Sequence, residues 1–443
     1  MAKDDVNNFG SNITFPKSDD QEHTFTSPDD GFDDPYEKQF TLDDYLFSDS
    51  EQLNGLPKSY SRETLVRGAW VEVDLKAIRY NVRQAVRAVG PRCKVMAIVK
   101  ADAYGHGAVQ CANAALQSGA DMLGVATVEE GINLREADIS CPILILSQPP
   151  QTAIQYIIEF GLIPAIYTQK FALDYAEQAD RAKKRAPFHL AIDTGMNRIG
   201  VFYTQAAQFL QDISFHRALK YEGTFTHFAT ADEESDWDFR IQLKRFNQAL
   251  EAIRNVGFNP GVVHAANSAA IFRYKEAHFD MVRLGICMYG LSPSPATRRL
   301  VELHPAMSVK ARISHVKEPL LGEGVSYGLN YRVASKIQIA TLPLGYADGV
   351  RRELQSRFKV LCNNRVCHQV GNICMDQMMI EVPLGRTLDG RRGGAEVGDE
   401  VVIIGRQGDL AIDAETMADA LHTITYEITC LFGLRLPKVY LDD

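Results

Sequence analysis

Short apolar runs rich in β-branched residues alternate with segments of helical periodicity between residues 94 and 284. The helical segments place apolar residues three or four positions apart, as in Ala108–Gln117 and Phe239–Arg254. The eight expected strands are Lys94–Lys100, Met122–Ala126, Pro142–Leu146, Ile163–Tyr167, Phe188–Ile192, Tyr221–Thr226, Val262–Ala265 and Asp280–Leu284. Several of them are continuously apolar, as buried parallel strands should be. Eight strands that are each followed by a helix predict an α/β protein with a (β/α)8 TIM-type barrel.

A doubly wound open sheet would show a similar alternation of strands and helices. Its dinucleotide-binding form carries a Gly-x-Gly-x-x-Gly motif after the first strand. No such motif follows Lys94–Lys100, so the barrel is favoured.

After about Leu303 the pattern changes to strands that are separated by turns rich in Gly, Asp and Arg, with little helix. Examples of these strands are Ile337–Leu342, Phe358–Cys362 and Val401–Ile404. We therefore expect a barrel domain at 63–302 and a mostly-β C-terminal domain at 303–443, with the Ser-Pro-Ser-Pro segment 292–295 as a linker. The strand-like segment 69–74 precedes the barrel. It could pair with the C-terminal sheet, which the sequence pattern alone does not decide.

The first 60 residues hold 14 acidic and 4 basic side chains, a balance of −10, whereas the whole chain carries −9. The acidic excess thus belongs to an extension, 1–62, that lacks a sustained apolar period and is expected to be disordered. The sequence assigns no role to this extension. One patch within it, 40–47, could form a short docking helix, but a solvated tail with one apolar spot is the favoured interpretation.

The composition of the 443-residue chain excludes several classes of protein. With 46% hydrophobic residues, it is too apolar to be disordered throughout. Its negative charge gives no field that would favour nucleic acid or an anionic membrane, and no apolar run reaches the ~18 residues of a membrane span. There is no apolar signal-peptide core, and the eight cysteines form no Cys-x-x-Cys pair, so we expect reduced thiols, a cytoplasmic location and no metal site.

Polar side chains follow several of the predicted strands, where a barrel gathers its chemistry. Lys100 ends the first strand, and a lysine beside a buried apolar strand is costly unless it is paired or used. Desolvation makes such an amine nucleophilic, which suits a Schiff base. Arg198 lies in a Gly-bounded turn that suits a carboxylate, and His227 follows the sixth strand. A lysine that reaches solvent, a surface arginine and an ordinary structural histidine would give the same pattern.

The loops after strands seven and eight supply Ser268, Gly285 and Ile286, together with a buried-looking Arg283. These two loops commonly bind phosphate in barrels, although Ser268 could also be a plain helix cap. A lysine at strand one and a phosphate site at strands seven and eight together fit a phosphate-bearing aldehyde. Pyridoxal 5'-phosphate is the obvious candidate.

The residues from about Gly68 to Tyr440 resemble alanine racemases, the barrel-type pyridoxal-phosphate enzymes. The matching segments are Val99–Gly107, Asp193–Gly200, Thr226–Ala229, Asn267-Ser268, Val282–Ile286, Val325–Gly328, Leu344–Gly349, Cys374–Gln377 and Arg435–Lys438. This order of segments, spread over both expected domains, makes the resemblance specific.

The resemblance implies roles in cofactor binding for nine residues. Lys100 would hold the cofactor as a Schiff base, and Arg283 would contact the pyridine nitrogen and be hydrogen-bonded by His227. The cofactor phosphate would be held by Tyr104, Ser268, Gly285 and Ile286, with Asn267 alongside. Arg198 would contact the cofactor's phenolic oxygen and the substrate carboxylate.

The resemblance also implies a head-to-tail homodimer in which each active site is shared between the two chains. The partner's second domain would contribute Tyr327, Tyr346, Met375 and Asp376. Lys100 and Tyr327 would be the two catalytic bases on opposite faces of the substrate, and Tyr346, Met375 and Asp376 would line the substrate side. The implied reaction interconverts L-alanine and D-alanine, which serves cell wall precursor supply.

Two positions depart from the family pattern. The family often carries a carbamylated lysine two residues before Asp193, where this chain has Ala191, so the negative partner of Arg198 is in doubt. It also often has a tyrosine at the position of Leu434, which contacts the phosphate and the side-chain pocket. Leu434 leaves open whether the preference is for alanine alone.

Three other functions compete with alanine racemisation. A serine or broader racemase of the same fold is the nearest alternative, because one methylene or hydroxyl changes binding by only ~1–3 kcal/mol in an apolar pocket. Decarboxylases of basic amino acids share the two-domain plan, but they place an acidic residue at the pyridine nitrogen, where this chain has Arg283. A single-barrel pyridoxal-phosphate carrier would lack the second domain that contains Tyr327.

Overall fold

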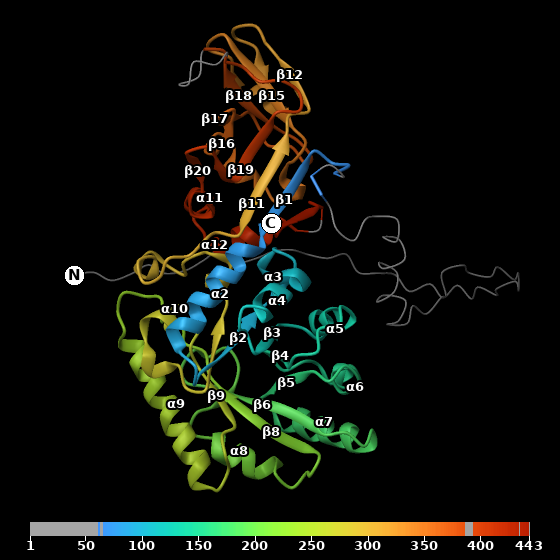
Figure 1. Ribbon diagram of the computed structural model, residues 1–443, viewed down its shortest axis with the longest axis vertical. Helices are drawn as coiled ribbons and strands as arrows, with labels where there is room; N and C mark the ends of the chain where they lie inside the picture. The colour runs from blue at the N-terminus through green and yellow to red at the C-terminus, as the bar shows by residue number, and fades with distance from the viewer. Residues whose placement is uncertain (1–60, 63–64, 386–392, 434, 443) are drawn as a thin grey trace, which may run out of the picture. The chain divides into compact units, whose positions relative to one another are not determined.

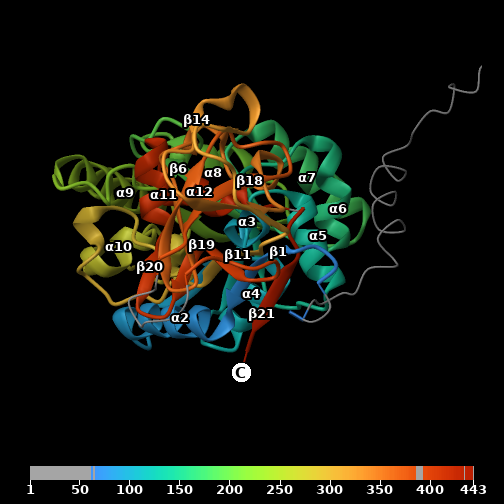
Figure 2. The same cartoon turned by 90° about the horizontal axis from the view of Figure 1, so that it is seen from above.

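The computed structural model describes residues 61–62, 65–385, 393–433 and 435–442. The expected extension, 1–62, and its apolar patch therefore lie almost wholly outside the described residues. Figures 1 and 2 show the elements of the described part from two directions.

Eight parallel strands between residues 94 and 284 form a closed barrel. They are β2 (Lys94–Ile98), β3 (Met122–Val125), β4 (Ile143–Ile145), β5 (Ile163–Ile166), β6 (Ala186–Asp193), β8 (Leu219–Phe225), β9 (Val262–His264) and β10 (Met281–Leu284). Pairing of β2 with β10 and of β5 with β6 closes the ring, and the two-residue β7 (Val201–Phe202) attaches to β6. All eight strands fall within two residues of their predicted starts, which confirms the predicted barrel.

Helices follow the barrel strands along the chain, as Figure 1 shows. They are α3 (Lys100–Tyr104), α4 (Ala108–Leu116), α5 (Val128–Glu136), α6 (Ile154–Glu159), α7 (Gln169–Arg181), α8 (Ala206–Ile213), α9 (Trp237–Asn255) and α10 (Ser268–Arg273). A further helix, α2 (Leu75–Val89), precedes the first barrel strand, and the Asp74 carboxylate caps it by accepting from the amide of Ala77.

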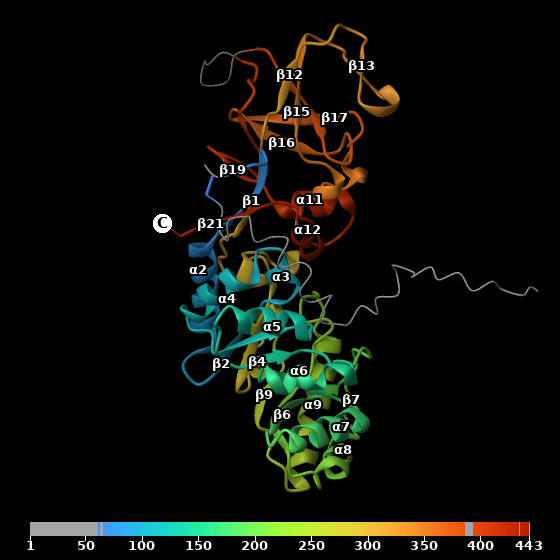
Figure 3. The same ribbon diagram turned by 90° about the vertical axis from the view of Figure 1, so that its right-hand side faces the viewer.

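The C-terminal part is built on a mostly antiparallel sheet, which confirms the predicted mostly-β domain. Its strands run in the order β12 (His315–Lys317), β15 (Ile337–Leu342), β18 (Met378–Pro383), β17 (Arg365–Val370), β16 (Lys359–Cys362), β19 (Glu400–Gln407), β11 (Met307–Arg312), β1 (Ala69–Asp74) and β21 (Lys438–Leu441). A short strand, β20 (Leu410–Ile412), pairs with β19, and β13 (Gly324–Val325) forms a separate hairpin with β14 (Tyr331–Arg332). Figure 3 shows these strands from the side.

The first strand of the chain belongs to this C-terminal sheet. β1 pairs antiparallel with β11 and parallel with β21. A buried Glu72 on β1 forms an ion pair with Lys310 of β11 at 3.0 Å. Segments from both ends of the described chain therefore complete one sheet.

Two C-terminal helices, α11 (Ala414–Leu421) and α12 (Thr425–Leu431), were not expected from the sequence. α12 packs against α3, the segment that follows the first barrel strand, β2.

No helix of the described residues is long and apolar enough to cross a bilayer. All eight cysteines are free.

Candidate active site

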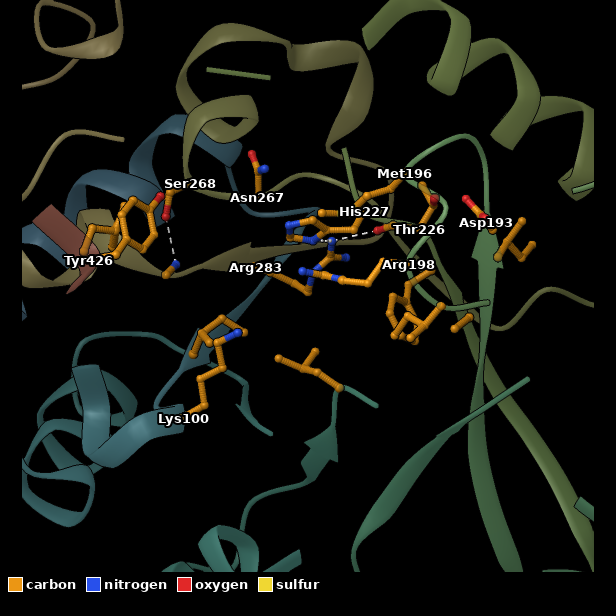
Figure 4. Close-up of a pocket in the computed structure, with 18 of the residues that line it drawn as sticks. Lys100, Asp193, Met196, Arg198, Thr226, His227, Asn267, Ser268, Arg283 and Tyr426 are labelled. Atoms are coloured by element: carbon orange, nitrogen blue, oxygen red, sulfur yellow. Dashed lines mark hydrogen bonds between the residues drawn. The ribbon is translucent and has the colours of Figure 1, made fainter. Parts of the chain in front are cut away.

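A pocket of about 300 Å³ lies where the barrel strands end, which is within the usual range for a small-molecule site. It is lined by every barrel residue that the sequence proposed for the site: Lys100, Tyr104, Arg198, His227, Asn267, Ser268, Arg283, Gly285 and Ile286. Figure 4 shows Ser268 and Tyr426 at one end of this pocket, Arg283 and His227 in the middle, and Arg198 beyond them.

Lys100 lies two residues after the end of β2 and is largely enclosed by the pocket. Its amine makes no hydrogen bond or ion pair with the described residues. Burial, and then the positive charge of Arg198, lower the pKa of the Lys100 amine below its usual value. The neutral, nucleophilic form is therefore more populated near neutral pH than it would be for an exposed lysine.

The four residues after Lys100 form a left-handed turn. The φ angles of Ala101, Asp102, Ala103 and Tyr104 lie between 50° and 54°. Such a conformation costs roughly 1–2 kcal/mol for each residue other than glycine, so the surrounding structure must hold it. This turn sets the directions of Lys100 and Tyr104 as they enter the pocket.

Carboxylates at both ends hold this left-handed turn. Glu130, in the capping box of α5, accepts from the amide of Ala101 at 2.6 Å. Asp102 accepts from the amide of Ala108 at the start of α4 and forms an ion pair with Lys438 of β21 at 3.0 Å. Residues of α5, α4 and the C-terminal sheet thus stabilise the strained backbone.

The hydroxyls of Tyr104 and Ser268 face the open space beside Gly285. A Cβ atom on Gly285 would lie 3.1 Å from Tyr104 Oη and 3.5 Å from Ser268 Oγ. Ser268 Oγ accepts from the amides of Gly285 at 2.9 Å and Cys287 at 3.4 Å. Tyr426 of α12 lines the same end of the pocket, with its ring 6.1 Å from that of Tyr104. This cluster of hydroxyls suits a phosphate group.

The guanidinium of Arg283 is buried and held from several sides. Its Nη2 donates to the carbonyls of Thr226 (2.7 Å) and Ala265 (2.9 Å) and contacts His227 Nδ1 at 3.1 Å. Its Nη1 contacts Nδ1 of His264 at 3.0 Å and the carbonyl of the same residue at 3.1 Å. The Nε–H group donates to no described residue, so one donor remains for a pyridine nitrogen.

Arg283 and His227, in the middle of the pocket, differ in charge. Burial, and then the charge of Arg198, lower the pKa of Arg283 to about 9. Burial and the neighbouring Arg283 also lower the pKa of His227 well below its usual value, so this imidazole is neutral. A guanidinium donates hydrogen bonds and does not accept them. His227 therefore accepts from Arg283 at Nδ1 and carries its own proton on Nε2.

Arg198 lies in the turn after β6, and it is exposed. Asp193 Oδ1 shapes this turn by accepting from the amides of Gly195 (2.9 Å) and Asn197 (3.1 Å). Arg198 itself makes no hydrogen bond or ion pair within the described part of the chain. Ala191 is buried and lines the pocket, and its short side chain offers no charge to Arg198.

The four residues that the sequence assigned to the partner side form a second cluster. Tyr327, Tyr346, Met375 and Asp376 line one cavity together, and none of them lines the barrel pocket. Tyr327 follows β13 and is 74% exposed, while Asn372 donates from Nδ2 to its carbonyl at 2.8 Å. Asp376 pairs with Arg435 at 2.7 Å. The structure thus separates the nine barrel residues from these four within one chain.

The barrel pocket fits pyridoxal phosphate by its donor set. It offers an amine without a partner, hydroxyls around the space beside Gly285, and one unused Arg283 donor. Among the described residues, no group of His, Cys, Asp and Glu could hold a metal ion.

Several contributors were not found from the sequence. Tyr426 lies in an unexpected helix, Glu130 acts through a backbone contact, and His264 contacts Arg283 from an apolar strand. Only contacts in the folded structure reveal such residues. Leu434, one of the two departures from the family pattern, lies outside the described residues.

Comparisons with known proteins agree with this geometry. Family profiles described as "Alanine racemase, N-terminal domain" and "Alanine racemase, C-terminal domain" match residues 73–293 and 306–440. Alanine racemase of Symbiobacterium thermophilum is 42% identical over 375 residues, which cover 85% of this chain and 97% of that protein. Alanine racemase of a Nostoc species is 41% identical over 375 residues, covering 84% and 95%.

Solved structures show the same similarity. The crystal structure of alanine racemase from Bacillus anthracis with bound L-Ala-P superposes with a TM-score of 0.80 at 37% identity, covering 86% of this chain and 96% of that one. The chain therefore belongs to the alanine racemase family, whose members are pyridoxal-phosphate-dependent isomerases.

Proposed function

We propose that this protein interconverts L-alanine and D-alanine with pyridoxal phosphate as its cofactor. The observation that carries this proposal is the pocket itself, in which an unpaired Lys100 amine faces the same cavity as Arg283 and the phosphate-type hydroxyls. Relatives that carry the name alanine racemase, which are 42% and 41% identical over 85% and 84% of this chain, support the same function.

Cofactor binding is assigned to the barrel residues. Lys100 would hold the cofactor covalently, and the hydroxyls of Tyr104, Ser268 and Tyr426 would bind its phosphate. Gly285, Ile286 and the side chain of Asn267, which line the same pocket, would lie alongside the phosphate. Arg283 would donate from Nε to the pyridine nitrogen, and its contact with His227 keeps the guanidinium in place. When bound, the cofactor supplies an electron sink that acidifies the Cα–H bond of the substrate.

Racemisation needs a base on one face of the substrate and an acid on the other. Burial and the charge of Arg198 lower the pKa of the Lys100 amine, which favours its neutral form and suits it to accept a proton. Tyr327 is the proposed group for the opposite face, and its exposed phenol is free to enter a second subunit. Arg198 would bind the substrate carboxylate, which its exposed position at the rim of the pocket supports.

We propose a homodimer because the two halves of the proposed site line different cavities of one chain. In a head-to-tail pair, Tyr327, Tyr346, Met375 and Asp376 of one protomer would cover the barrel pocket of the other. Exposed Tyr327, Tyr346 and Met375 give this second cluster the apolar surface that an interface needs.

Alanine is the proposed substrate, and serine or a broader set of small amino acids is the alternative. We further propose a cytoplasmic location, which the eight free cysteines support. The product D-alanine would serve the supply of cell wall precursors.

Racemisation of L-alanine, L-serine and L-lysine by the purified full-length chain with pyridoxal phosphate tests the function. We expect D-alanine to form fastest, no amine product from lysine, and no activity in a Lys100→Ala variant. A faster reaction with serine would support the alternative, and decarboxylation of lysine would contradict the proposal.

A mixture of two inactive variants tests the shared site. Lys100→Ala and Tyr327→Phe homodimers would each be inactive, whereas a mixed dimer would contain one intact site. After subunit exchange we expect about one quarter of the wild-type activity per site, because half of the dimers are mixed and half of their sites are intact. No recovery, with exchange confirmed by mass, would contradict shared sites.

A further inference from the structure

A chain of hydrogen-bonding side chains runs from Arg283 into the barrel interior. Nη1 of Arg283 lies 3.0 Å from Nδ1 of His264, and Nε2 of His264 lies 2.8 Å from Nδ1 of His189. His264 ends β9 and His189 lies in the middle of β6, and both side chains are buried. Neither histidine lines the pocket, so this chain of contacts reaches the site only through Arg283.

The direction of these hydrogen bonds follows from the chemistry of arginine. A guanidinium donates and does not accept, so His264 must accept at Nδ1 and carry its proton on Nε2. That proton can then be donated only to His189 Nδ1, so His189 carries its own proton on Nε2. His189 thus fixes which nitrogen of His264 is left to accept from Arg283.

Local packing keeps the two rings in register. A Cβ atom on Gly223 would lie 2.7 Å from His189 Nδ1 and 2.8 Å from the carbonyl of Val262, so the ring occupies space that only a glycine leaves. On the other side, Phe225 stacks on the His264 ring at 5.0 Å and lies under the Arg283 guanidinium at 5.6 Å. The contacts therefore form within a rigid, close-packed interior.

Both imidazoles are neutral in the fold. Burial lowers the pKa of His189 to about 4. Burial, and then the charge of Arg283, lower the pKa of His264 well below its usual value. A protonated His264 would present a second donor to Arg283, which the contact does not allow.

We propose that His189 is a positioning residue for the racemase reaction, which fixes the His264 tautomer and thereby the orientation of Arg283 toward the cofactor ring. This inference rests on the proposed function for its kinetic consequence, but not for the hydrogen-bond pattern itself. His189 does not contact substrate or cofactor in this arrangement. Its effect passes through His264, which holds Nη1 of Arg283 so that Nε–H faces the pocket.

Two substitutions separate the acceptor from the bulk of the side chain. His189→Asn keeps an oxygen near the position of Nδ1, whereas His189→Leu fills the space without an acceptor. In the holoenzyme we expect the Leu variant to lose roughly tenfold in kcat with a smaller change in KM, the size expected for one buried hydrogen bond. We expect the Asn variant to stay within about twofold of the wild type by the same reasoning. The absorbance maximum of the bound cofactor should shift in the Leu variant only.

A tautomer measurement tests the hydrogen-bond pattern independently of activity. Nitrogen-15 NMR of histidine-labelled holoenzyme should show His264, His189 and His227 neutral and protonated on Nε2, with His264 assigned by its loss in a His264→Gln sample. In His189→Leu, the His264 signals should broaden or move toward the Nδ1–H form.

Each result decides the inference. A wild-type His264 protonated on Nδ1, or equal kinetics and spectra in the Leu and Asn variants, would overturn it. If the Leu variant does not fold, the wild-type tautomers and the Asn variant still decide. An enzyme without racemase activity that shows the expected tautomers would refute the proposed function and leave the hydrogen-bond pattern standing.

Discussion

At the scale of single residues, burial keeps several histidines neutral. His106 and His189 both have a pKa lowered to about 4, chiefly because their surroundings exclude water. His106 Nδ1 lies 3.0 Å from the carbonyls of Ala103 and Tyr104, so this neutral ring also holds the left-handed turn. Protonation of these histidines therefore opposes the folded state.

The lowered pKa values of His106 and His189 predict that the free energy of unfolding falls in acid. The contribution of each histidine is fully present above the unfolded pKa of ~6.5 and is lost as the pH falls toward 4, because only the unfolded chain binds the proton in that range. Each should remove about 3 kcal/mol from the free energy of unfolding between these limits. Denaturant midpoints at pH 7.5 and pH 5 measure the effect, and His189→Asn should show a smaller decrease. Equal midpoints at both pH values would contradict it.

A second prediction concerns Arg198, which has no ionic partner in the described part of the chain. An Ala191→Lys variant assayed with bicarbonate can form a carbamate beside Arg198 and hold its guanidinium in place. We expect KM for alanine to fall about two- to fivefold, as for a modest ion pair. Ala191→Met, which adds similar bulk without charge, is the control. An unchanged KM in the Lys variant would show that Arg198 needs no such partner.

The sequence identified the pocket residues that follow strands, because the end of a strand can be recognised from the hydrophobic pattern along the chain. Lys100, Arg198 and His227 come from such positions, and Arg283 lies within the last barrel strand, β10, although their roles stay proposals. His189 and Tyr426 could not be found in this way. Their importance lies in contacts with residues far away in the chain, which a pattern along the sequence does not contain.

At the scale of elements, α3 is the most strained segment of the described protein near the pocket. Its left-handed residues are held by Glu130, by Asp102 and by close packing on the C-terminal part. A Cβ atom on Gly105 would lie 2.2 Å from the carbonyl of Thr429, and one on Gly107 would lie 1.8 Å from Tyr440 Oη. Lys100, the proposed cofactor lysine, is thus placed by an element that both domains support.

Ala101 offers a direct test because its side chain is exposed and its φ is 53°. Ala101→Val places a β-branched residue in a conformation that it strongly disfavours, and should destabilise the protein by roughly 1–2 kcal/mol and lower cofactor occupancy. Ala101→Gly should change stability by less than about 1 kcal/mol, because relief of strain offsets the greater entropy of the unfolded chain. Thermal melting and absorbance of the bound cofactor measure both, and equal loss in the two variants would argue against strain.

The barrel strands were predictable because buried parallel strands are apolar throughout, and β4 is the clearest case. The helices α11 and α12 were missed for the opposite reason. They have eight and seven residues, too few for a helical period to stand out among turns. Length therefore limited the prediction more than composition did.

At the scale of the whole molecule, we expect the acidic N-terminal segment to be dispensable for the proposed reaction. Deleting residues 1–60 should leave kcat and KM for alanine within about twofold, because every proposed site residue lies after this segment in the chain. Deleting 1–62 also removes Arg62, which pairs with Glu72 at 2.7 Å, while Lys310 and Trp70 still contact Glu72. A small loss of thermal stability is expected only in the longer deletion. Loss of activity in the shorter one would assign the segment a catalytic role.

The pairing of β1 has a consequence for biosynthesis. Ribosomes make β1 before the barrel, yet its neighbour β11 does not begin until Met307, and β21 follows at Lys438. During translation, therefore, the whole barrel leaves the ribosome before either strand that pairs with β1 has been made. The barrel can fold while β1 is still unpaired. A nascent chain arrested between the two domains would expose the unpaired edges of β1. We expect a chaperone to bind this intermediate in preference to the finished chain.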